Sequence, residues 1–471
     1  MSGSTVNAVA RDSGVLTVIN PANGEAIAEV PECTQPELDA AFAAAAAAQP
    51  AWAADESLRR RLLRRLAEVI PAAADELAEL LVSESGKPVG LARLEPAATA
   101  QLWLSWLADT ELPVERLADD AAARIEVRRR PLGVVAAVTP WNFPIASLLT
   151  KIGPALRTGN TVVAKSSPFT PLAARRLGEI IGEVLPAGIV QVISGGDRVG
   201  AAMCNHPVPR KVSFTGSIAA GKAVATAAGE DLKRVTLELG GNDAAILLDD
   251  IEIDAIVPAV FARAFFNTGQ TCAIPKRIYV PRSIYDLVLD AFVACAEAAT
   301  LGTGAEATMG PLSTAPQYAR VSDLVAEAIA DGARAAAGGA PVAGPGYWFE
   351  PTILTGARDE LRVVAEEQFG PALPILPYDT VDEALRRANG TMYGLCGSVW
   401  GTDLERAAAV SQRLECGVAY VNSHGAHRPS APVAGVKWSG IGAEHGLEGL
   451  LEYTDPQILF QAPAPVATAL V

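Results

Sequence analysis

The chain has 471 residues, more than one ordinary hydrophobic core holds, and this length predicts two large domains with room for a small appendage. Its formal net charge of −15 argues against a nucleic-acid partner, because neutralising phosphates requires a basic surface. No apolar run approaches the roughly 20 residues that span a bilayer, and the N-terminus lacks a signal-sequence pattern, so we expect a cytoplasmic protein with no membrane partner. The six cysteines have neither paired nor metal-ligand spacing, which predicts no metal and no disulfide framework.

The first hundred residues follow helical patterns. Thr34 and Glu37 have the spacing of a capping box, which predicts the start of an alanine-rich helix that continues through residue 48. Further helices are expected over 57–70 and 72–83.

Two segments far apart in the chain read as exposed strands. Residues 124–128 alternate in polarity, and a strand-like pattern returns near 457–460. The polar face of the first segment indicates a sheet edge or a subunit contact, and we expect the two segments to pair with each other.

From residue 131 onward, short apolar runs alternate with helical segments such as 171–185. This rhythm predicts a parallel sheet covered on both faces by helices, with ligands bound at the carboxyl ends of the strands. The expected strands are 134–138, 161–164, 189–193, 211–214, 235–239 and 244–248. A second α/β layer is expected after residue 250, with helices over 253–266 and 283–299 and strands over 277–280, 375–378 and 417–422.

Cys272 stands out among the cysteines because small and polar residues precede it, in the stretch 265–271. We interpret it as a covalent nucleophile. Glu238 lies among apolar and glycine neighbours, where loss of hydration would favour its neutral form and make it a tunable acid or base. A cysteine and a tunable carboxyl group together indicate acyl-transfer chemistry.

Asn142 is bracketed by Pro140 and Pro144, so its side-chain amide belongs to a rigid turn. An amide donor aimed at a nucleophile suits an oxyanion hole, and capping of the following helix is the structural alternative.

A glycine turn containing Gly216, Ser217 and Gly221 follows the expected strand 211–214 and precedes a helix, an arrangement typical of phosphate binding. The spacing nearly matches a Walker A loop. Ala223, however, stands where a serine or threonine would bind magnesium, which argues against a nucleotide hydrolase.

These motifs, together with the segment 367–371, stand in the order and at the spacings of the aldehyde dehydrogenase superfamily, which the sequence resembles over essentially its whole length. The resemblance implies an α/β fold with a Rossmann-like cofactor domain, an α/β catalytic domain and a small β oligomerisation arm in a homodimer or homotetramer. The implied boundaries are 1–112 and 132–240 for the cofactor domain, 241–438 for the catalytic domain, and 113–131 and 451–471 for the oligomerisation strands.

The resemblance implies oxidation of an aldehyde to a carboxylic acid with NAD(P)+. Cys272 would attack the carbonyl carbon, Asn142 would hold the oxyanion of the thiohemiacetal, and Glu238 would activate the water that hydrolyses the thioester. Lys151 would orient the neighbourhood of Glu238 or Asn142. A CoA-acylating semialdehyde dehydrogenase, or a non-catalytic protein with the same fold, remains as the alternative.

The implied cofactor is NAD, with NADP possible. Relatives that favour NAD often carry a glutamate three positions after the lysine at 165, and here Pro168 occupies that position. Ser166 and Ser167 supply no positive charge for the 2′-phosphate of NADP. The residues expected to contact the cofactor are Thr139, Pro140, Trp141, Lys165, Ser167, Pro168, Phe214, Gly216, Ser217, Gly221, Leu239, Glu367 and Phe369.

The substrate side departs from the family pattern in two places. Ser147 and Thr150 stand where relatives often have bulkier residues, which predicts a wider pocket. His424, His427 and Arg428 lie on the expected substrate loop, where they either read a polar or anionic substrate or are simply solvated. The expected pocket residues are Phe143, Ser147, Thr150, Phe266, Thr271, Ala273, His427 and Val433.

Overall fold

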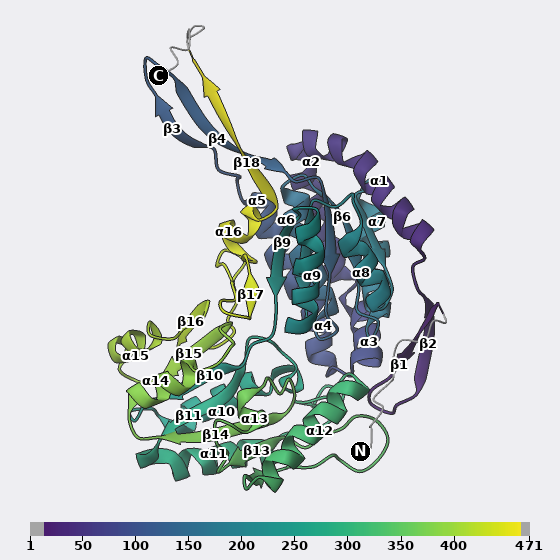
Figure 1. The fold of residues 1–471 in the computed structure, drawn as a ribbon. Coiled ribbons are helices and arrows are strands. Elements are labelled where there is room, and N and C mark those ends of the chain that lie inside the picture. Colours follow the sequence, from purple (N-terminus) through teal and green to yellow (C-terminus); the bar gives the residue numbers. More distant parts are fainter. Residues whose placement is uncertain (1–13, 463–471) are drawn as a thin grey trace.

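The computed structural model describes residues 14–462, which form two large sheets, a projecting three-stranded arm and a hairpin near the start of the chain (Figure 1). The hairpin, β1 (Val15–Ile19) and β2 (Ala26–Pro31), is antiparallel and was not expected from the sequence. The expected α/β class, with its small β arm, is confirmed.

The first sheet has six strands in the order β17-β9-β8-β5-β6-β7. Its strands β5 to β9 are parallel, so their carboxyl ends meet at one edge. Only β17, from the far end of the chain, runs antiparallel, and it pairs with β9. The bounds are β5 Val134–Val138, β6 Thr161–Lys165, β7 Val190–Ile193, β8 Lys211–Thr215, β9 Arg234–Glu238 and β17 Gly440–Ile441.

The second sheet has seven strands in the order β12-β13-β14-β11-β10-β15-β16, and all neighbours are parallel except β12 and β13. The expected strand at 244–248 lies here, in the second unit rather than at the end of the first. The bounds are β10 Asp243–Leu247, β11 Pro275–Pro281, β12 Arg334–Ala337, β13 Thr352–Thr355, β14 Ala372–Tyr378, β15 Cys396–Trp400 and β16 Val418–Val421.

The arm consists of β3 (Glu115–Asp119), β4 (Arg124–Pro131) and β18 (Thr454–Gln461), with β4 in the centre. β18 pairs antiparallel with β4 along its whole length, from Thr454 opposite Pro131 to Gln461 opposite Arg124. The expected pairing of the two distant segments is therefore correct. Figure 1 shows the arm extending away from both sheets.

The predicted capping box is present, because the side chains of Thr34 and Glu37 each accept a hydrogen bond from the other residue's backbone N–H. The expected helices all form, with ends shifted by a few residues. Those before the second sheet are α1 Gln35–Ala54, α2 Glu56–Ala72, α3 Ala74–Ser85, α4 Val89–Thr99, η1 Ala100–Leu104, α5 Ser105–Asp109, α6 Pro144–Arg157, α7 Pro171–Val184, α8 Asp197–Asn205 and α9 Ile218–Glu230. The later ones are α10 Ile253–Ala264, η2 Phe266–Gly269, η3 Arg282–Ile284, α11 Tyr285–Glu297, α12 Ala315–Ala330, α13 Arg362–Ala365, α14 Val381–Asn389, α15 Leu404–Ser411 and α16 Gly446–Leu451.

Alternate residues of the central strand β5 face two different cores. Val135 and Ala137 belong to a core with α2, α6 and α7, whereas Val134, Ala136 and Val138 belong to one with α1, α8 and α9. Burial on both faces explains why this strand reads as a continuous apolar run rather than an alternating one.

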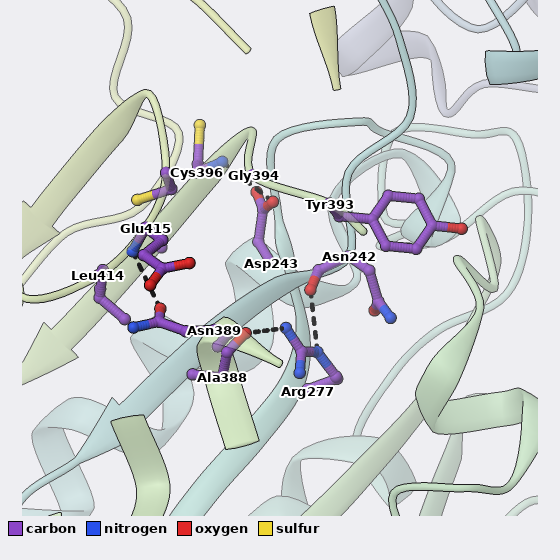
Figure 2. Close-up of a pocket in the computed structure, with 13 residues that line it drawn as sticks. Asn242, Asp243, Arg277, Ala388, Asn389, Tyr393, Gly394, Cys396, Leu414 and Glu415 are labelled. Atoms are coloured by element: carbon purple, nitrogen blue, oxygen red, sulfur yellow. Dashed lines mark hydrogen bonds between the residues drawn. The ribbon is translucent and has the colours of Figure 1, made fainter. Parts of the chain in front are cut away.

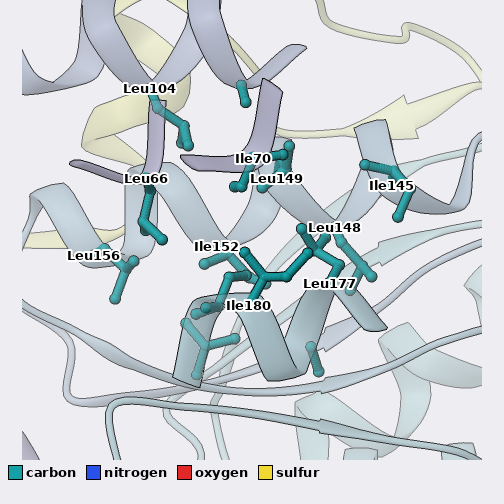
Figure 3. Close-up of a cluster of buried hydrophobic side chains, with 14 of the residues drawn as sticks. Leu66, Ile70, Leu104, Ile145, Leu148, Leu149, Ile152, Leu156, Leu177 and Ile180 are labelled. Atoms are coloured by element: carbon teal, nitrogen blue, oxygen red, sulfur yellow. The ribbon is translucent and has the colours of Figure 1, made fainter. Parts of the chain in front are cut away.

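Helix α6 is fixed in place by its apolar face. Its side chains Leu148, Leu149 and Ile152 are buried against Leu66 and Ile70 of α2 and against Leu177 and Ile180 of α7 (Figure 3). This packing sets the position of the turn that precedes α6 and of the polar residues that α6 carries.

Candidate active site

Cys272 lies in the turn between η2 and β11, at the junction of the two sheets. Asn267 and Thr268 adopt left-handed backbone angles, with φ of 52° and 59°, which bends the chain sharply before the cysteine. The thiol is half-buried, and burial raises the pKa of Cys272 to about 12. The ammonium group of Lys276 opposes this rise, since a nearby cation favours the thiolate.

Asn142 follows β5 and is hydrogen-bonded to the turn that carries the cysteine. Its Nδ2 donates to the carbonyl oxygen of Gln270 at 2.9 Å, and Nδ2 of Asn267 donates back to the carbonyl oxygen of Asn142 at 3.2 Å. A side-chain amide has two hydrogens, so one remains for an oxyanion beside Cys272. The amide is buried, which favours a fixed orientation.

Glu238 ends β9 and is also buried, and its Oε1 has no hydrogen-bond partner among residues 14–462. Burial raises its pKa well above the usual value, and the carboxylate of Glu444 raises it further, while Lys151 acts in the opposite direction. Lys151 forms a buried ion pair with Glu444. Lys151 therefore acts on the neighbourhood of Glu238 through Glu444, a residue that the sequence interpretation missed.

Glu367 lies between the backbone after Glu238 and the backbone of the cysteine turn. Its Oε1 accepts hydrogen bonds from the N–H of Gly241 at 3.1 Å and from Nζ of Lys276 at 3.2 Å. Lys276 also donates to the carbonyl oxygen of Cys272. Lys276 thus connects the expected cofactor residue with the expected nucleophile, and it was not singled out from the sequence.

The ring of Phe369 meets that of Trp141 edge-on, with centroids 5.4 Å apart. Phe369 has a left-handed φ of 53°, and Nζ of Lys276 lies 5.9 Å from the centroid of its ring. Two expected cofactor contacts that are far apart in the sequence are therefore neighbours in the fold.

Several polar groups lie at the carboxyl ends of β6 and β7. Lys165 ends β6, and its Nζ donates to the carbonyl oxygens of Gly195 at 2.8 Å and Ser166 at 3.0 Å. The hydroxyl groups of Ser166 and Ser194 are buried and have no partner among the described residues. Unpartnered buried hydroxyl groups at this edge fit a polar ligand such as a nucleotide.

The glycine turn follows β8 and so lies at the same edge of the first sheet. The N–H of Gly216 donates to the carbonyl oxygen of Glu238 at 3.0 Å, and the Ser217 hydroxyl caps α9. A Cβ atom at Gly221 would lie 2.5 Å from Cδ2 of Leu239, so the glycine lets α9 pack closely against this side chain. Phe214 and Leu239 are buried in the core under the turn. The remaining expected contacts lie at the same strand ends: Thr139 and Ser167 are buried, and Pro140 and Pro168 are half-buried.

The expected pocket residues include two stacked rings, Phe143 and Phe266, with centroids 5.9 Å apart and planes at 15°. Nζ of Lys87 lies 4.0 Å from the centroid of the Phe143 ring. Two other expected residues donate hydrogen bonds from their hydroxyl groups: Thr150 to the carbonyl oxygen of Ser147 at 3.2 Å, and Thr271 to the carbonyl oxygen of Phe266 at 3.3 Å. Ala273 packs in an apolar cluster with Leu395 and Cys396. Val433 forms a backbone bridge with Glu444.

Neither interpretation of His424 was right, because this residue is a buried structural side chain. It is only 1% exposed, and its ring nitrogens contact the Ser398 hydroxyl at 2.9 Å and the Asp243 carboxylate at 3.2 Å. His427 and Arg428 are exposed. For these two residues, both alternatives stand: contact with a polar or anionic substrate, or simple solvation.

A polar pocket lies behind the cysteine turn, around the start of β10 (Figure 2). Arg277 donates to the carbonyl oxygens of Asn242 at 2.9 Å and Ala388 at 3.0 Å, and Asp243 accepts from the N–H of Cys396 at 3.1 Å. Cys272 does not line this pocket. The hydrogen bonds of Arg277 and Asp243 instead fix the segment that follows Glu238.

Buried charges also hold the turn of Asn142 from the other side. Glu95 of α4 accepts hydrogen bonds from the N–H groups of Ile145 at 3.0 Å and Ala146 at 3.1 Å, at the N-terminus of α6, and pairs with Lys87. The sequence signal for this pair was two opposite charges eight positions apart.

The comparisons with known proteins agree with this geometry. The model of the aldehyde dehydrogenase family matches residues 8–459. The phenylacetaldehyde dehydrogenase of Pseudomonas fluorescens is 37% identical over 480 residues, which cover 98% of this chain and 94% of that protein.

Solved structures are similar over the whole chain. The NAD+ complex of an aldehyde dehydrogenase from Bacillus cereus has a TM-score of 0.93 at 33% identity, covering 96% of this chain and 94% of that one. An NADP-dependent enzyme of Escherichia coli has a TM-score of 0.92 at 34% identity, covering 95% of both chains.

Fold and site together define an oxidoreductase of the NAD(P)-dependent aldehyde dehydrogenase class. The chain belongs to the aldehyde dehydrogenase family, and the family and reaction class expected from the sequence are confirmed. Within residues 14–462, every helix is too short or too polar to span a membrane.

Proposed function

We propose that this protein oxidises an aldehyde to a carboxylic acid with Cys272 as nucleophile, Asn142 as oxyanion donor and Glu238 as general base. The proposal rests on one observation: the three segments that contain these residues meet at one place in the fold. Asn142 is bonded to the cysteine turn through Gln270, and the segment that follows Glu238 passes close to the cysteine, because a side chain at Gly241 would come within 2.8 Å of the Cys272 carbonyl oxygen.

In the first step, the thiolate sulfur of Cys272 forms a bond to the carbonyl carbon, and the carbonyl oxygen becomes an alkoxide. The free hydrogen of the Asn142 amide and the N–H of Cys272 are the donors available to this oxygen. Preorganised donors of this kind stabilise the developing charge without having to reorient during the reaction.

The nicotinamide cofactor, when bound, accepts the hydride that leaves the thiohemiacetal carbon. We propose that Lys165 and the hydroxyl groups of Ser166 and Ser194 hold its adenosine end, and that the turn of Gly216 and Ser217 holds its phosphates. Glu367 is placed to accept from the ribose next to the nicotinamide. Both NAD and NADP are candidates, since the similar solved structures include an NAD+ complex and an NADP-dependent enzyme.

The oxidation leaves a thioester on Cys272, and water must attack its carbon to release the acid. Glu238 would take the proton from this water, a role that suits a buried carboxyl group with a raised pKa. A base at this position favours hydrolysis over transfer to coenzyme A.

The test is NAD(P)H formation from a panel of aldehydes with no coenzyme A added. Continuous turnover supports the hydrolytic assignment. Turnover only after coenzyme A is added would contradict it, and binding of NAD(P) without turnover of any aldehyde would favour a non-catalytic protein.

The stacked rings of Phe143 and Phe266 support an aldehyde with an apolar, ring-sized body. The name of the Pseudomonas fluorescens relative points to the same class, so arylacetaldehydes belong at the head of the panel.

We further propose that 1–112 and 132–240 form the cofactor domain, 241–438 the catalytic domain, and 113–131 and 451–471 the oligomerisation strands of a cytoplasmic homodimer or homotetramer. Residues 463–471 of the last segment lie outside the described residues. Exposed apolar side chains on the arm support the assembly: Val114 (58%), Leu117 (57%), Ile458 (60%) and Phe460 (63%).

A further inference from the structure

His445 has a backbone conformation that is almost restricted to glycine. Its φ of 60° and ψ of 174° fall in a region that is strained for an L-residue and that persists only where the surroundings fix it. On one side, the preceding Glu444 is held by two 2.8 Å backbone hydrogen bonds with Val433. On the other, the N–H of Gly446 donates to the carbonyl oxygen of Pro429 at 2.9 Å. The ring of His445 is therefore rigidly placed.

The position of this ring is beside the proposed reaction centre. Glu444, its neighbour in the chain, forms the ion pair with Lys151 and raises the pKa of Glu238. The ring of His445 also lies near that of His427, with the two ring centroids 6.1 Å apart. The loop of His427 passes directly over Ala273, the residue after the nucleophile, because a side chain at Gly425 would come within 2.7 Å of the Ala273 carbonyl oxygen.

Trp103 fixes the tautomer of His445. The indole Nε1 of Trp103 donates to Nδ1 of His445 at 2.8 Å, and an indole nitrogen is only a donor. Nδ1 must therefore accept. Burial lowers the pKa of His445 below its usual value, so the ring is neutral at pH 7 and its hydrogen is on Nε2.

This Nε2–H group has no acceptor among residues 14–462, and Nε2 is not among the sealed, unpartnered polar atoms of the protein. The half-buried ring therefore offers one donor, in a fixed direction, to whatever enters beside it. Neither the tryptophan nor the histidine was among the residues expected from the sequence.

We propose that His445, locked by Trp103, is a specificity-determining residue that donates a hydrogen bond from Nε2 to an uncharged oxygen atom on the body of the aldehyde, such as an ether or hydroxyl oxygen. The proposal rests on the proposed function of the site. A site that offers a donor discriminates against an analogue that lacks the acceptor, because the donor is then left unpaired.

The test compares 4-methoxyphenylacetaldehyde with 4-ethylphenylacetaldehyde, in which a methylene group replaces the ether oxygen at nearly constant shape. We expect the wild-type protein to favour the methoxy compound in kcat/KM by about 5–10-fold, the worth of one hydrogen bond. His445→Phe should bring this preference close to one, mainly through KM of the methoxy compound.

Trp103→Phe is the second variant, because it removes the donor that fixes the tautomer while leaving His445 in place. It should reduce the preference by a factor of about two or more, since Nδ1–H and Nε2–H forms then share the population. Trp106→Phe, on the same helical segment, is the matched control and should retain the wild-type preference. Circular dichroism establishes that each variant folds, and if His445→Phe does not, Trp103→Phe against Trp106→Phe decides.

An unchanged preference in folded Trp103→Phe and His445→Phe protein would overturn the proposal, as would a wild-type protein that oxidises both aldehydes equally well. If neither these two nor any other aldehyde of the panel is oxidised, the proposed function itself fails. The two failures are therefore distinguishable.

Discussion

Asn142 and Gln270 connect the two sheets at the point where chemistry is proposed. Nδ2 of Asn142, at the end of β5, donates to the carbonyl oxygen of Gln270 at 2.9 Å, two residues before Cys272 in the second unit. Asn267 returns a hydrogen bond to the backbone of Asn142 at 3.2 Å. The oxyanion donor and the nucleophile therefore have a fixed mutual position before any substrate binds, which is the condition for electrostatic preorganisation.

Asn142→Ala tests this relationship. The variant lacks the amide donor, whose hydrogen bond becomes stronger as the oxyanion forms. We therefore expect kcat to fall by about 100–1000-fold with little change in KM. Cofactor affinity, measured by fluorescence titration with NADH, should stay near that of the wild-type protein. A variant with unaltered kcat would show that the oxyanion is held elsewhere.

Cys272→Ala should abolish aldehyde oxidation, because no other described thiol shares the turn next to Asn142. Cys416→Ala is the matched control: this cysteine is also half-buried, but it lines the pocket behind the turn. Its removal should leave steady-state kcat unchanged. Oxidation by folded Cys272→Ala protein would contradict the assignment of the nucleophile.

Glu238→Gln should separate the two halves of the reaction. The amide cannot take a proton from water, so one NAD(P)H per subunit should form in a burst and turnover should then slow by about 100-fold or more. In the wild-type protein the burial of Glu238 raises its pKa. Its basic form is therefore lost as pH falls through this raised value, and deacylation should slow as pH falls. Rapid-quench measurement of the burst at pH 6 and pH 8 checks both statements.

The sequence predicted those catalytic residues whose local setting carries the signal. Cys272 is preceded by small and polar residues, Glu238 is next to a glycine pair, and Asn142 lies between prolines; all three are legible within a few positions of the chain. Strands β5 to β9 of the first sheet and β10, β11, β14 and β16 of the second were also predicted, because burial on two faces makes such runs largely apolar. Strands β12, β13, β15 and β17 were not predicted.

The partners of these residues were not predictable, because they come together only in three dimensions. Lys151 and Glu444 are 293 positions apart, and Trp103 and His445 are 342 apart. His424 could be placed on a loop by sequence, but its burial depends on strands β10 and β15 supplying hydrogen-bond partners for both ring nitrogens.

Lys276→Met tests the electrostatic support of the nucleophile. Burial raises the pKa of Cys272 to about 12, and Lys276 is the cation that lowers it. Below that pKa the thiolate fraction grows about tenfold per pH unit, so alkylation by iodoacetamide should speed up about 100-fold between pH 7 and pH 9.

Removing Lys276 should raise the pKa of Cys272 further. The profile of alkylation rate against pH should therefore move to higher pH, and alkylation should be slower at every pH below the pKa. Lys222→Met, which removes a lysine over the Trp438 ring at 3.4 Å, is the control and should leave the profile in place. Identical profiles for Lys276→Met and wild type would exclude Lys276 as the supporting cation.

Phe460→Asp tests the proposed role of the arm. Phe460 is 63% exposed on β18, beside the exposed Ile458, and such side chains are expected to be covered in an assembly. A buried carboxylate without a partner at this position is costly, so the variant should sediment as a smaller species than the wild-type protein.

The matched control is Leu287→Asp, because Leu287 is likewise 63% exposed but lies on α11, at the opposite end of the molecule from the arm (Figure 1). This variant should sediment as the wild type does. Sedimentation velocity at several protein concentrations separates the outcomes: a wild-type monomer at all concentrations, or a Phe460→Asp variant that assembles as tightly as the control, would contradict the assignment of the arm to subunit association.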